Sequence, residues 1–465
     1  MKAKIVCDYR RHFPAGGQSR SADFTVNLSL DAKFGNVYLE PALIAQAIGS
    51  PLDCVSRDLC EIAAYVYMAD KAVPRGRYEK WTRDLAFLVP VGDPDRWNSV
   101  KEILTNTVGT LSGDNVAFQF VSKVSRKEST ARSLLSESRA MPKSDCSCLF
   151  SGGLDSFAGA AYLVQEQRRQ PLFASHYVSG LKNVQSGLIG AIQREFGRTF
   201  HHFQYRVTSR RSKQTRFPYQ AKESSHRARS FLFLSFATVA AALRGLSDIF
   251  ICENGVLSLN VPISDARKGS RSTRHAHPLY LFYFNQLIDA LYERKFNLTN
   301  PFLFWTKGEE AAFLRGTNLY PLIKGTVTCW GYPNQTLQYD CNHCGYCLPC
   351  IVRRVSLIAT GLERYDDCYV VDVFGPGEKL SEKQQRNVED LAYFCHCFAM
   401  MSKTELVYRY PELVMVETGA SGSSGDGMGK IIRVYKKFAE EFLAVAERLK
   451  PGLVEATLRE ASVSR

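Results

Sequence analysis

The stretch CLFSGGLDSFAGA, residues 148–160, constrains the fold of this chain more than any other part of the sequence. Residues 146–150 have the length and apolar character of a buried strand, and residues 157–164 have the pattern of a helix. Two glycines and two serines lie between them. Glycine lets the backbone approach an anion closely, and the free amides at a helix N-terminus attract anions. The stretch therefore predicts a phosphate-binding turn, and an ordinary strand-to-helix turn capped by serine is the alternative.

Strand-like and helix-like segments alternate after this stretch. Strands are predicted at 171–178, 199–207 and 248–254, and helices at 184–196 and 225–243. A chain that alternates in this way forms parallel strands joined by right-handed crossovers through helices. We therefore expect the α/β class, with a doubly wound parallel sheet in the middle of the chain.

Two further regions flank this unit. The polar segment 122–143 indicates a linker or a surface hairpin, and the chain becomes helical beyond about residue 361. Strands are predicted at 4–9, 23–30, 36–40 and 85–91, and helices at 52–69, 98–104, 382–401 and 430–449. The domains expected are an N-terminal α/β domain suited to partner recognition, a phosphate-binding α/β domain and a helical C-terminal region, at 1–140, 141–360 and 361–465.

Five of the fourteen cysteines fall between Cys329 and Cys350, and four of these five are spaced by C-x₂-C steps. Tetrahedral Zn²⁺ takes four thiolates, and tight turns supply them in pairs. This spacing predicts a structural zinc site, and an iron–sulfur cluster with similar spacing is the alternative. Five cysteines for four positions leave one cysteine spare, which the spacing alone does not identify.

The formal net charge of +13 fits either a polyanionic partner or pockets for phosphates and carboxylates. A nucleic-acid partner is therefore open but not favoured. The most apolar run, residues 231–243, is shorter than the roughly 20 residues that a membrane-spanning helix needs. No long apolar segment follows Lys2 and Lys4, and the many cysteines suit a reducing compartment. We expect a cytoplasmic protein without a membrane partner.

The sequence SGGLDS resembles the PP-loop of the ATP pyrophosphatase superfamily, whereas the GxxxxGK[ST] pattern of Walker loops is absent. Enzymes of that superfamily cleave ATP between the α- and β-phosphates and pass AMP to an acceptor oxygen. The resemblance implies that Asp155 helps to place Mg²⁺. The residues that would bind ATP by this resemblance are Ser151, Gly152, Gly153, Leu154, Asp155 and Ser156.

Further stretches resemble the 7-cyano-7-deazaguanine synthase (QueC) family, and the resemblance covers roughly residues 145–355. SHRARSFLFLSFATVAAAL is similar to a family helix that carries an arginine, here Arg229. PFLFWTKGEEAAF is similar to a TKAE-containing stretch, with matches at Thr306, Lys307 and Glu309. The resemblance implies that Arg229 and Lys307 contact phosphate or carboxylate, and these two with Asp155 are the expected catalytic residues.

The same family carries a cysteine at a strand end, followed by CGxCxxCxxR. TVTCW and CGYCLPCIVR, the latter ending at Arg353, are similar to these two motifs. The interval between the motifs is longer than is usual in the family, so the extra cysteine, Cys341, keeps some claim on the metal. The zinc ligands that the resemblance implies are Cys329, Cys344, Cys347 and Cys350.

The substrate side departs from the family pattern. Family members carry an SGYPDCR segment that faces a purine-like substrate, but here the SGYP portion is missing and only DxR matches. This departure implies a modified acceptor side. His275 and His277 follow in the same loop, where a polar surface loop is favoured over an acid–base role. The substrate-binding residues implied by the resemblance are Glu253, Asn254, Asp265 and Arg267.

The added N- and C-terminal regions make the chain similar to the extended QueC-like proteins of bacterial anti-phage operons of the Qat and type IV CBASS kinds. That resemblance implies an ATP-dependent ligase that adenylates 7-carboxy-7-deazaguanine. The acceptor would be an amine of a partner protein encoded in the same operon. The alternatives are an authentic 7-cyano-7-deazaguanine synthase that uses ammonia, a tRNA-modifying PP-loop enzyme, and a nucleotide-sensing scaffold without catalysis.

Overall fold

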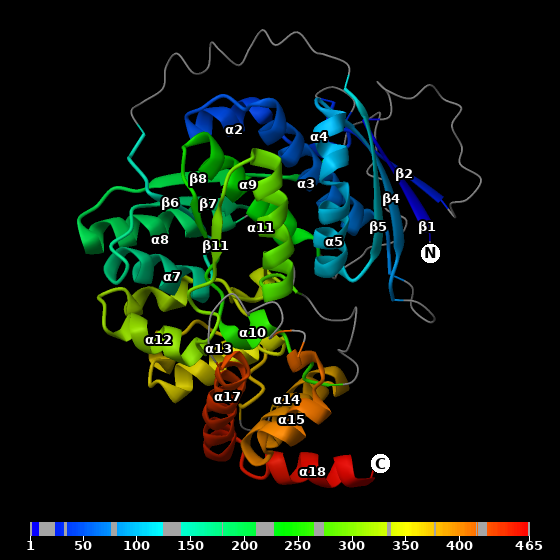
Figure 1. The fold of residues 1–465 in the computed structure, drawn as a ribbon. Coiled ribbons are helices and arrows are strands. Elements are labelled where there is room, and N and C mark those ends of the chain that lie inside the picture. Colours follow the sequence, from blue (N-terminus) through cyan, green and yellow to red (C-terminus); the bar gives the residue numbers. More distant parts are fainter. Residues whose placement is uncertain are drawn as a thin grey trace.

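Two parallel β-sheets, a layer of helices between them and a helical C-terminal region make up the computed structural model of this chain (Figure 1). The structure describes residues 2–8, 24–31, 35–75, 81–123, 141–178, 180–210, 227–264, 274–332, 336–375, 378–414, 416 and 426–463.

Four parallel strands form the first sheet. On its edge strand, Val116, Phe118 and Phe120 are buried while the residues between them are exposed, because alternate side chains of a strand point to opposite faces. The strands predicted at 4–9, 23–30 and 85–91 are confirmed. The edge strand at 115–122 was not predicted. In order across the sheet, the strands are β2 (Phe24–Leu28), β1 (Lys2–Cys7), β4 (Asp84–Val91) and β5 (Asn115–Ser122).

Three of the four helices of this region begin at a capping residue or a proline. The Asp53 carboxylate accepts a hydrogen bond from the Ser56 amide at 2.7 Å, so the longest of these helices begins at the next residue, Cys54. The bounds predicted for a helix at 98–104 are wrong, because the chain leaves helical geometry at Val100 between two separate helices. The helices are α2 (Pro41–Ile48), α3 (Cys54–Ala72), α4 (Pro94–Ser99) and α5 (Lys101–Ser112).

Five parallel strands form the second sheet; the alternation of strands and helices predicts a parallel sheet and four of these strands, but not the one at 297–299. From β6 the chain moves outward to β7 and β8, then returns to the other side of β6. In sheets of this kind, ligands bind at the carboxyl ends of the strands where the strand order reverses, which here is between β6 and β10. In order across the sheet, the strands are β11 (Asn297–Thr299), β10 (Asp248–Phe250), β6 (Cys146–Leu149), β7 (Pro171–His176) and β8 (His201–Tyr205).

Both faces of the second sheet are covered. Leu172 and Ala174 belong to the core that contains α9, whereas Phe173 between them belongs to the core that contains α7 and α8. Helix α9 is apolar on all sides because α3 covers one side of it and the sheet covers the other. The helices around this sheet are α7 (Leu154–Gln165), α8 (Leu181–Phe196), α9 (Arg229–Leu243) and α11 (Pro278–Tyr292).

One continuous core joins the two sheets. Helices α3 and α5 pack against α9 and α11 between the sheets, as Figure 1 shows. The short strand predicted at 36–40 is β3 (Val37–Tyr38), and it pairs antiparallel with β9 (Thr208–Ser209) across the same boundary. Residues 124–140, where the domain boundary is predicted, lie outside the described residues.

The C-terminal region is helical, as predicted, and its core around Phe394, Phe398 and Tyr435 also includes side chains from 256–263 and from 351–358. None of the described helices is long and apolar enough to cross a membrane. The remaining helices are α10 (Gly255–Leu259), α12 (Lys307–Arg315), α13 (Leu348–Ala359), α14 (Glu382–Met400), α15 (Lys403–Arg409), α17 (Gly427–Leu449) and α18 (Leu453–Val463), with 3₁₀ turns η3 (Tyr320–Gly325), η4 (Leu337–Tyr339) and η5 (Glu363–Tyr365).

Candidate functional site

The glycine–serine loop lies between β6 and α7, at the reversal point of the second sheet. Gly152 has a φ of 84°, a left-handed conformation that favours glycine. The Ser156 hydroxyl donates to the Gly153 carbonyl at 3.0 Å and accepts from the Gly152 amide at 3.2 Å, while the Ser151 hydroxyl accepts from the Gly153 amide at 3.2 Å. The two hydroxyls therefore hold the loop in shape before any ligand binds.

Helix α7 presents its N-terminus beside this loop. Gly153 is its N-cap residue, and within the described parts of the chain no side chain caps the helix. The first backbone amides of a helix lack partners inside the helix, and together they form a site for an anion. Ser151 is exposed, whereas Leu154 and Ser156 are buried. The loop is thus suited to hold an anionic group at the surface.

A buried ion pair lies at the start of α7. The Lys307 ammonium, which is fully buried, donates to Asp155 Oδ1, and the Asn254 amide donates to Asp155 Oδ2 at 3.3 Å. Burial alone would raise the pKa of Asp155. The Lys307 charge acts in the opposite direction, and this pKa lies well below its usual range. Burial would lower the pKa of Lys307, and Asp155 raises it above its usual value. Both groups are therefore charged at neutral pH.

Glu310 lies against this pair, and no sequence motif singled it out. It is fully buried, and its carboxyl group lies within hydrogen-bonding reach of the Asp155 carboxylate. Burial and the neighbouring Asp155 raise its pKa well above the usual value. Lys307 and Glu310 are three residues apart on α12, so they share one face of the helix. That spacing was the available signal for Glu310.

The start of α12 is fixed by a capping box. The Thr306 hydroxyl accepts from the Glu309 amide at 3.1 Å, and the Glu309 carboxylate accepts from the Thr306 amide at 2.7 Å. Glu309 also forms an ion pair with Arg433 of α17, and the Thr306 hydroxyl donates to Glu441 of the same helix at 2.8 Å. The matched residues Thr306 and Glu309 therefore orient Lys307.

Glu253 and Asn254 follow β10 and lie across the reversal point from the loop. Asn254 is fully buried, and its amide bridges the Asp155 and Glu253 carboxylates, with 3.5 Å to Glu253 Oε1. Glu253 Oε2 lies 3.3 Å from His275 Nε2. Burial, then Asp155, raises the pKa of Glu253. Burial would lower the pKa of His275, but Glu253 raises it above the usual value.

The structure separates the two histidines of the loop. His275 reaches the site through Glu253, which differs from the favoured surface-loop interpretation. His277 is buried, and its Nδ1 accepts from the Leu279 amide at 3.2 Å as the N-cap of α11. His277 therefore has a structural role, whereas His275 joins the candidate site.

The remaining predicted residues lie at the edge of the site or outside the description. Arg229 is exposed at the first turn of α9, and its charge acts to lower the pKa of His275. Arg229 is therefore near the site, but no hydrogen bond joins it to the described residues of the Asp155 cluster. Asp265 and Arg267 lie outside the described residues.

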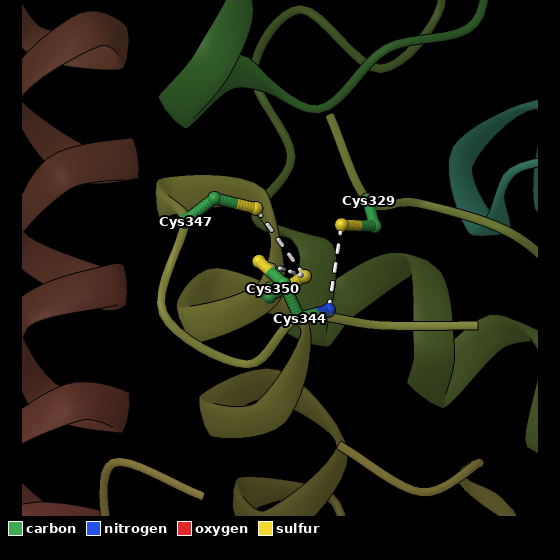
Figure 2. A group of neighbouring side chains, drawn as sticks. All are labelled: Cys329, Cys344, Cys347 and Cys350. Carbon is green, nitrogen blue, oxygen red and sulfur yellow. Dashed lines mark hydrogen bonds between the residues drawn. The ribbon is translucent and has the colours of Figure 1, made fainter. Parts of the chain in front are cut away.

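Four cysteines form a candidate metal centre. The sulfur atoms of Cys329, Cys344, Cys347 and Cys350 all lie within 4.8 Å of one another (Figure 2). Tetrahedral zinc with Zn–S bonds of about 2.3 Å separates its sulfurs by roughly 3.8 Å, so the group fits such an ion. The Gly331 and Cys344 amides donate to the Cys329 sulfur at 3.2 and 3.4 Å, which favours a thiolate there. The predicted four-cysteine group can hold a metal such as zinc.

Cys341 is not part of this group. It forms a disulfide with Cys368, with Cα atoms 5.3 Å apart. The interpretation that left Cys341 some claim on the metal is therefore wrong for this structure, because its sulfur is bonded elsewhere. The disulfide also departs from the expectation that the cysteines are reduced.

The candidate metal centre and the glycine–serine loop support each other. The Val327 amide donates to the Gly152 carbonyl at 2.9 Å, two residues before Cys329. Arg353 of α13 is fully buried and donates to Thr326 Oγ1 at 2.6 Å and to Thr328 Oγ1 at 3.1 Å. A metal that fixes Cys329 would thereby also fix the segment 326–328, which holds the loop at Gly152.

No family model matches this chain, and no curated protein matches it either.

Proposed function

We propose that this protein activates a carboxylic acid by transfer of AMP from ATP and then joins the acid to an amine. The observation that carries the proposal is the preorganised glycine–serine loop at the uncapped N-terminus of α7, beside the buried pair of Lys307 and Asp155. Backbone amides and a buried ammonium are the groups that neutralise polyphosphate charge during such a transfer. The likeness of SGGLDS to the PP-loop agrees with this chemistry.

Each group then has a role. The loop and the first amides of α7 bind the β- and γ-phosphates, which leave together as pyrophosphate. Lys307 holds positive charge next to the phosphates and keeps Asp155 ionised. Asp155 and Glu310 fit a hard cation, because two buried carboxyl groups lie together beside the loop and carboxylate oxygens are the ligands that such cations prefer. When bound there, Mg²⁺ would offset the negative charge of the phosphates.

The acid that we propose is 7-carboxy-7-deazaguanine, and the acceptor is an amine of a partner protein in anti-phage defence. The resemblance to the 7-cyano-7-deazaguanine synthases supports the acid, with Glu253 and Asn254 beside the loop as candidate contacts. The exposed charge of Arg229 near His275 suits a carboxylate or phosphate. The missing SGYP portion and the extra N- and C-terminal regions support a large acceptor in place of ammonia.

Exchange of labelled pyrophosphate into ATP tests the activation step. We expect exchange that requires 7-carboxy-7-deazaguanine and Mg²⁺, because the adenylate forms reversibly. The Asp155→Asn variant should lose roughly 100-fold or more of this exchange. The matched control is Asp95→Asn, an exposed aspartate of α4, which should exchange like the wild type. Wild-type protein that shows no acid-dependent exchange would contradict the proposal.

A further inference from the structure

His275 and Glu253 form a partly exposed polar pair beside the site, and activation of the acid leaves the His275 imidazole without a role. The two side chains are 26% and 21% exposed, while Asp155 and Lys307 behind them are almost completely buried. The pair is therefore the part of this cluster that a nucleophile from solvent can reach most easily.

The protein fixes the orientation of this pair. The His275 carbonyl accepts a hydrogen bond from the Ser230 hydroxyl of α9, and Nε2 of its ring faces Glu253 Oε2 at 3.3 Å. The Glu253 carbonyl accepts from Asn300 Nδ2 at 2.8 Å and from the Ser258 hydroxyl at 3.1 Å. With Nε2 committed to Glu253, Nδ1 is the ring atom that can exchange a proton with a ligand.

We propose that His275 is the general base that accepts the proton of the attacking amine, and that Glu253 is a positioning residue that orients the imidazole. This inference rests on the proposed function, because it concerns the second half of that reaction. A series of three contacts links this base to the start of α7. They join His275 to Glu253 at 3.3 Å, Glu253 to Asn254 at 3.5 Å and Asn254 to Asp155 at 3.3 Å.

The step is a proton-coupled acyl transfer. The neutral amine attacks the carbonyl carbon of the acyl adenylate and forms the C–N bond. Its nitrogen becomes cationic, and one N–H proton passes to Nδ1 of His275. The C–O bond to the phosphate breaks, AMP leaves with the electron pair, and the amide and a protonated His275 remain. The imidazolium is stabilised by the Glu253 carboxylate and returns its proton to solvent.

Other titratable groups of the described site are less suited to this step. Asp155 is held as a carboxylate by Lys307, and its pKa lies too far below neutrality for a base. Burial lowers the pKa of His176 to about 4 and the pKa of His277 to about 3. The Nδ1 atom of His277 also already caps α11. His275 remains, with Glu253 and Asp155 raising its pKa while burial and Arg229 lower it.

The test separates the two half-reactions of the His275→Gln variant. Pyrophosphate exchange reports activation. Capture of the acyl group by glycinamide reports transfer to an amine. Capture by hydroxylamine, a weakly basic nucleophile that is neutral near pH 7, reports transfer without a need for a strong base. The matched control is His277→Asn, because asparagine can keep the N-cap of α11.

We expect His275→Gln to lower capture by glycinamide by about 100-fold or more relative to capture by hydroxylamine. Wild-type capture by glycinamide should rise with pH through the pKa of His275, and the variant should lack that inflection. The Glu253→Gln variant should shift the inflection to lower pH, because the anion that raises the pKa is gone. The His277→Asn variant should keep the wild-type profile.

Three outcomes would overturn the inference. If His275→Gln captures glycinamide and hydroxylamine at the wild-type ratio while exchange is normal, His275 is no general base and the proposed function stands. If the folded variant loses exchange and both captures equally, His275 acts in activation. If the wild type shows no acid-dependent exchange, the proposed function fails and this inference fails with it.

Discussion

Replacement of Lys307 by methionine would show how strongly one buried cation stabilises the candidate site. Methionine keeps most of the length of the side chain but removes the charge that contacts Asp155. Glu310 and Glu253 also lie near the Lys307 ammonium, and their negative charges raise its pKa. Removal of one partner of a buried ion pair costs about 3–5 kcal/mol. We expect the free energy of unfolding, measured by urea titration, to fall by about that amount.

The dependence on pH gives this prediction a sign. In the wild type the pKa of Asp155 is lowered in the folded state, so its contribution is present above the unfolded pKa and is lost as pH falls through the folded pKa. In Lys307→Met, burial acts without the opposing cation and raises the pKa of Asp155. The free energy of unfolding that the variant loses, compared with the wild type, should therefore be smaller at about pH 5 than at about pH 8.

The matched control is Lys295→Met. Lys295 Nζ lies 3.0 Å from Asp289 Oδ2, but its side chain is 92% exposed. Because water and salt screen such a pair, we expect a change of less than about 1 kcal/mol. A Lys307→Met variant that unfolds at the wild-type urea concentration, or with an unchanged dependence on pH, would refute the argument that the cation stabilises the buried carboxylates.

Three further predictions concern the metal centre, one glycine and one carboxyl group. Cys344→Ser should lower the bound zinc, measured by elemental analysis, from about one ion per chain, whereas the exposed Cys54→Ser should not; equal zinc in both would contradict the assignment. Gly345→Ala should destabilise the fold far more than Gly452→Ala in thermal unfolding. Both glycines have positive φ, but a Cβ at 345 would lie 1.7 Å from a carbonyl oxygen, whereas a Cβ at 452 meets open space. Equal losses of stability in the two variants would argue against this packing. Burial raises the pKa of Glu441 to about 7, so stability should fall by roughly 2–3 kcal/mol as pH rises from about 4.5 to about 7. Urea titration of Glu441→Gln should lack that component, and an identical pH profile in the variant would oppose it.

Local patterns determined much of the fold. The apolar run, the glycines and the serines around SGGLDS predict a strand, a loop and a helix, because these residues act on the backbone within a few positions. The structure starts α7 at Leu154, three residues before the predicted helix, because Gly153 serves as the N-cap. The four cysteines that could hold a metal were likewise predicted, since three of them are close in sequence and Cys329 was matched by resemblance.

Residues whose role depends on distant partners were not predictable in this way. Glu310 looks like an ordinary charged residue of α12, and only the packing of α12 against α7 buries it beside Asp155. The disulfide of Cys341 with Cys368 likewise depends on how the segment after α13 folds back.

The sequence by itself therefore determined most of the elements, the glycine–serine turn between β6 and α7, and the cysteine set. The tertiary structure decided which side chains meet around them. Because β10 lies beside β6 in the sheet, Glu253 and Asn254 lie next to Asp155, although about 100 residues separate them in sequence. His275 joins the site through its contact with Glu253. The order of strands across a sheet is set by the packing of whole helices and strands, which no short stretch of sequence contains.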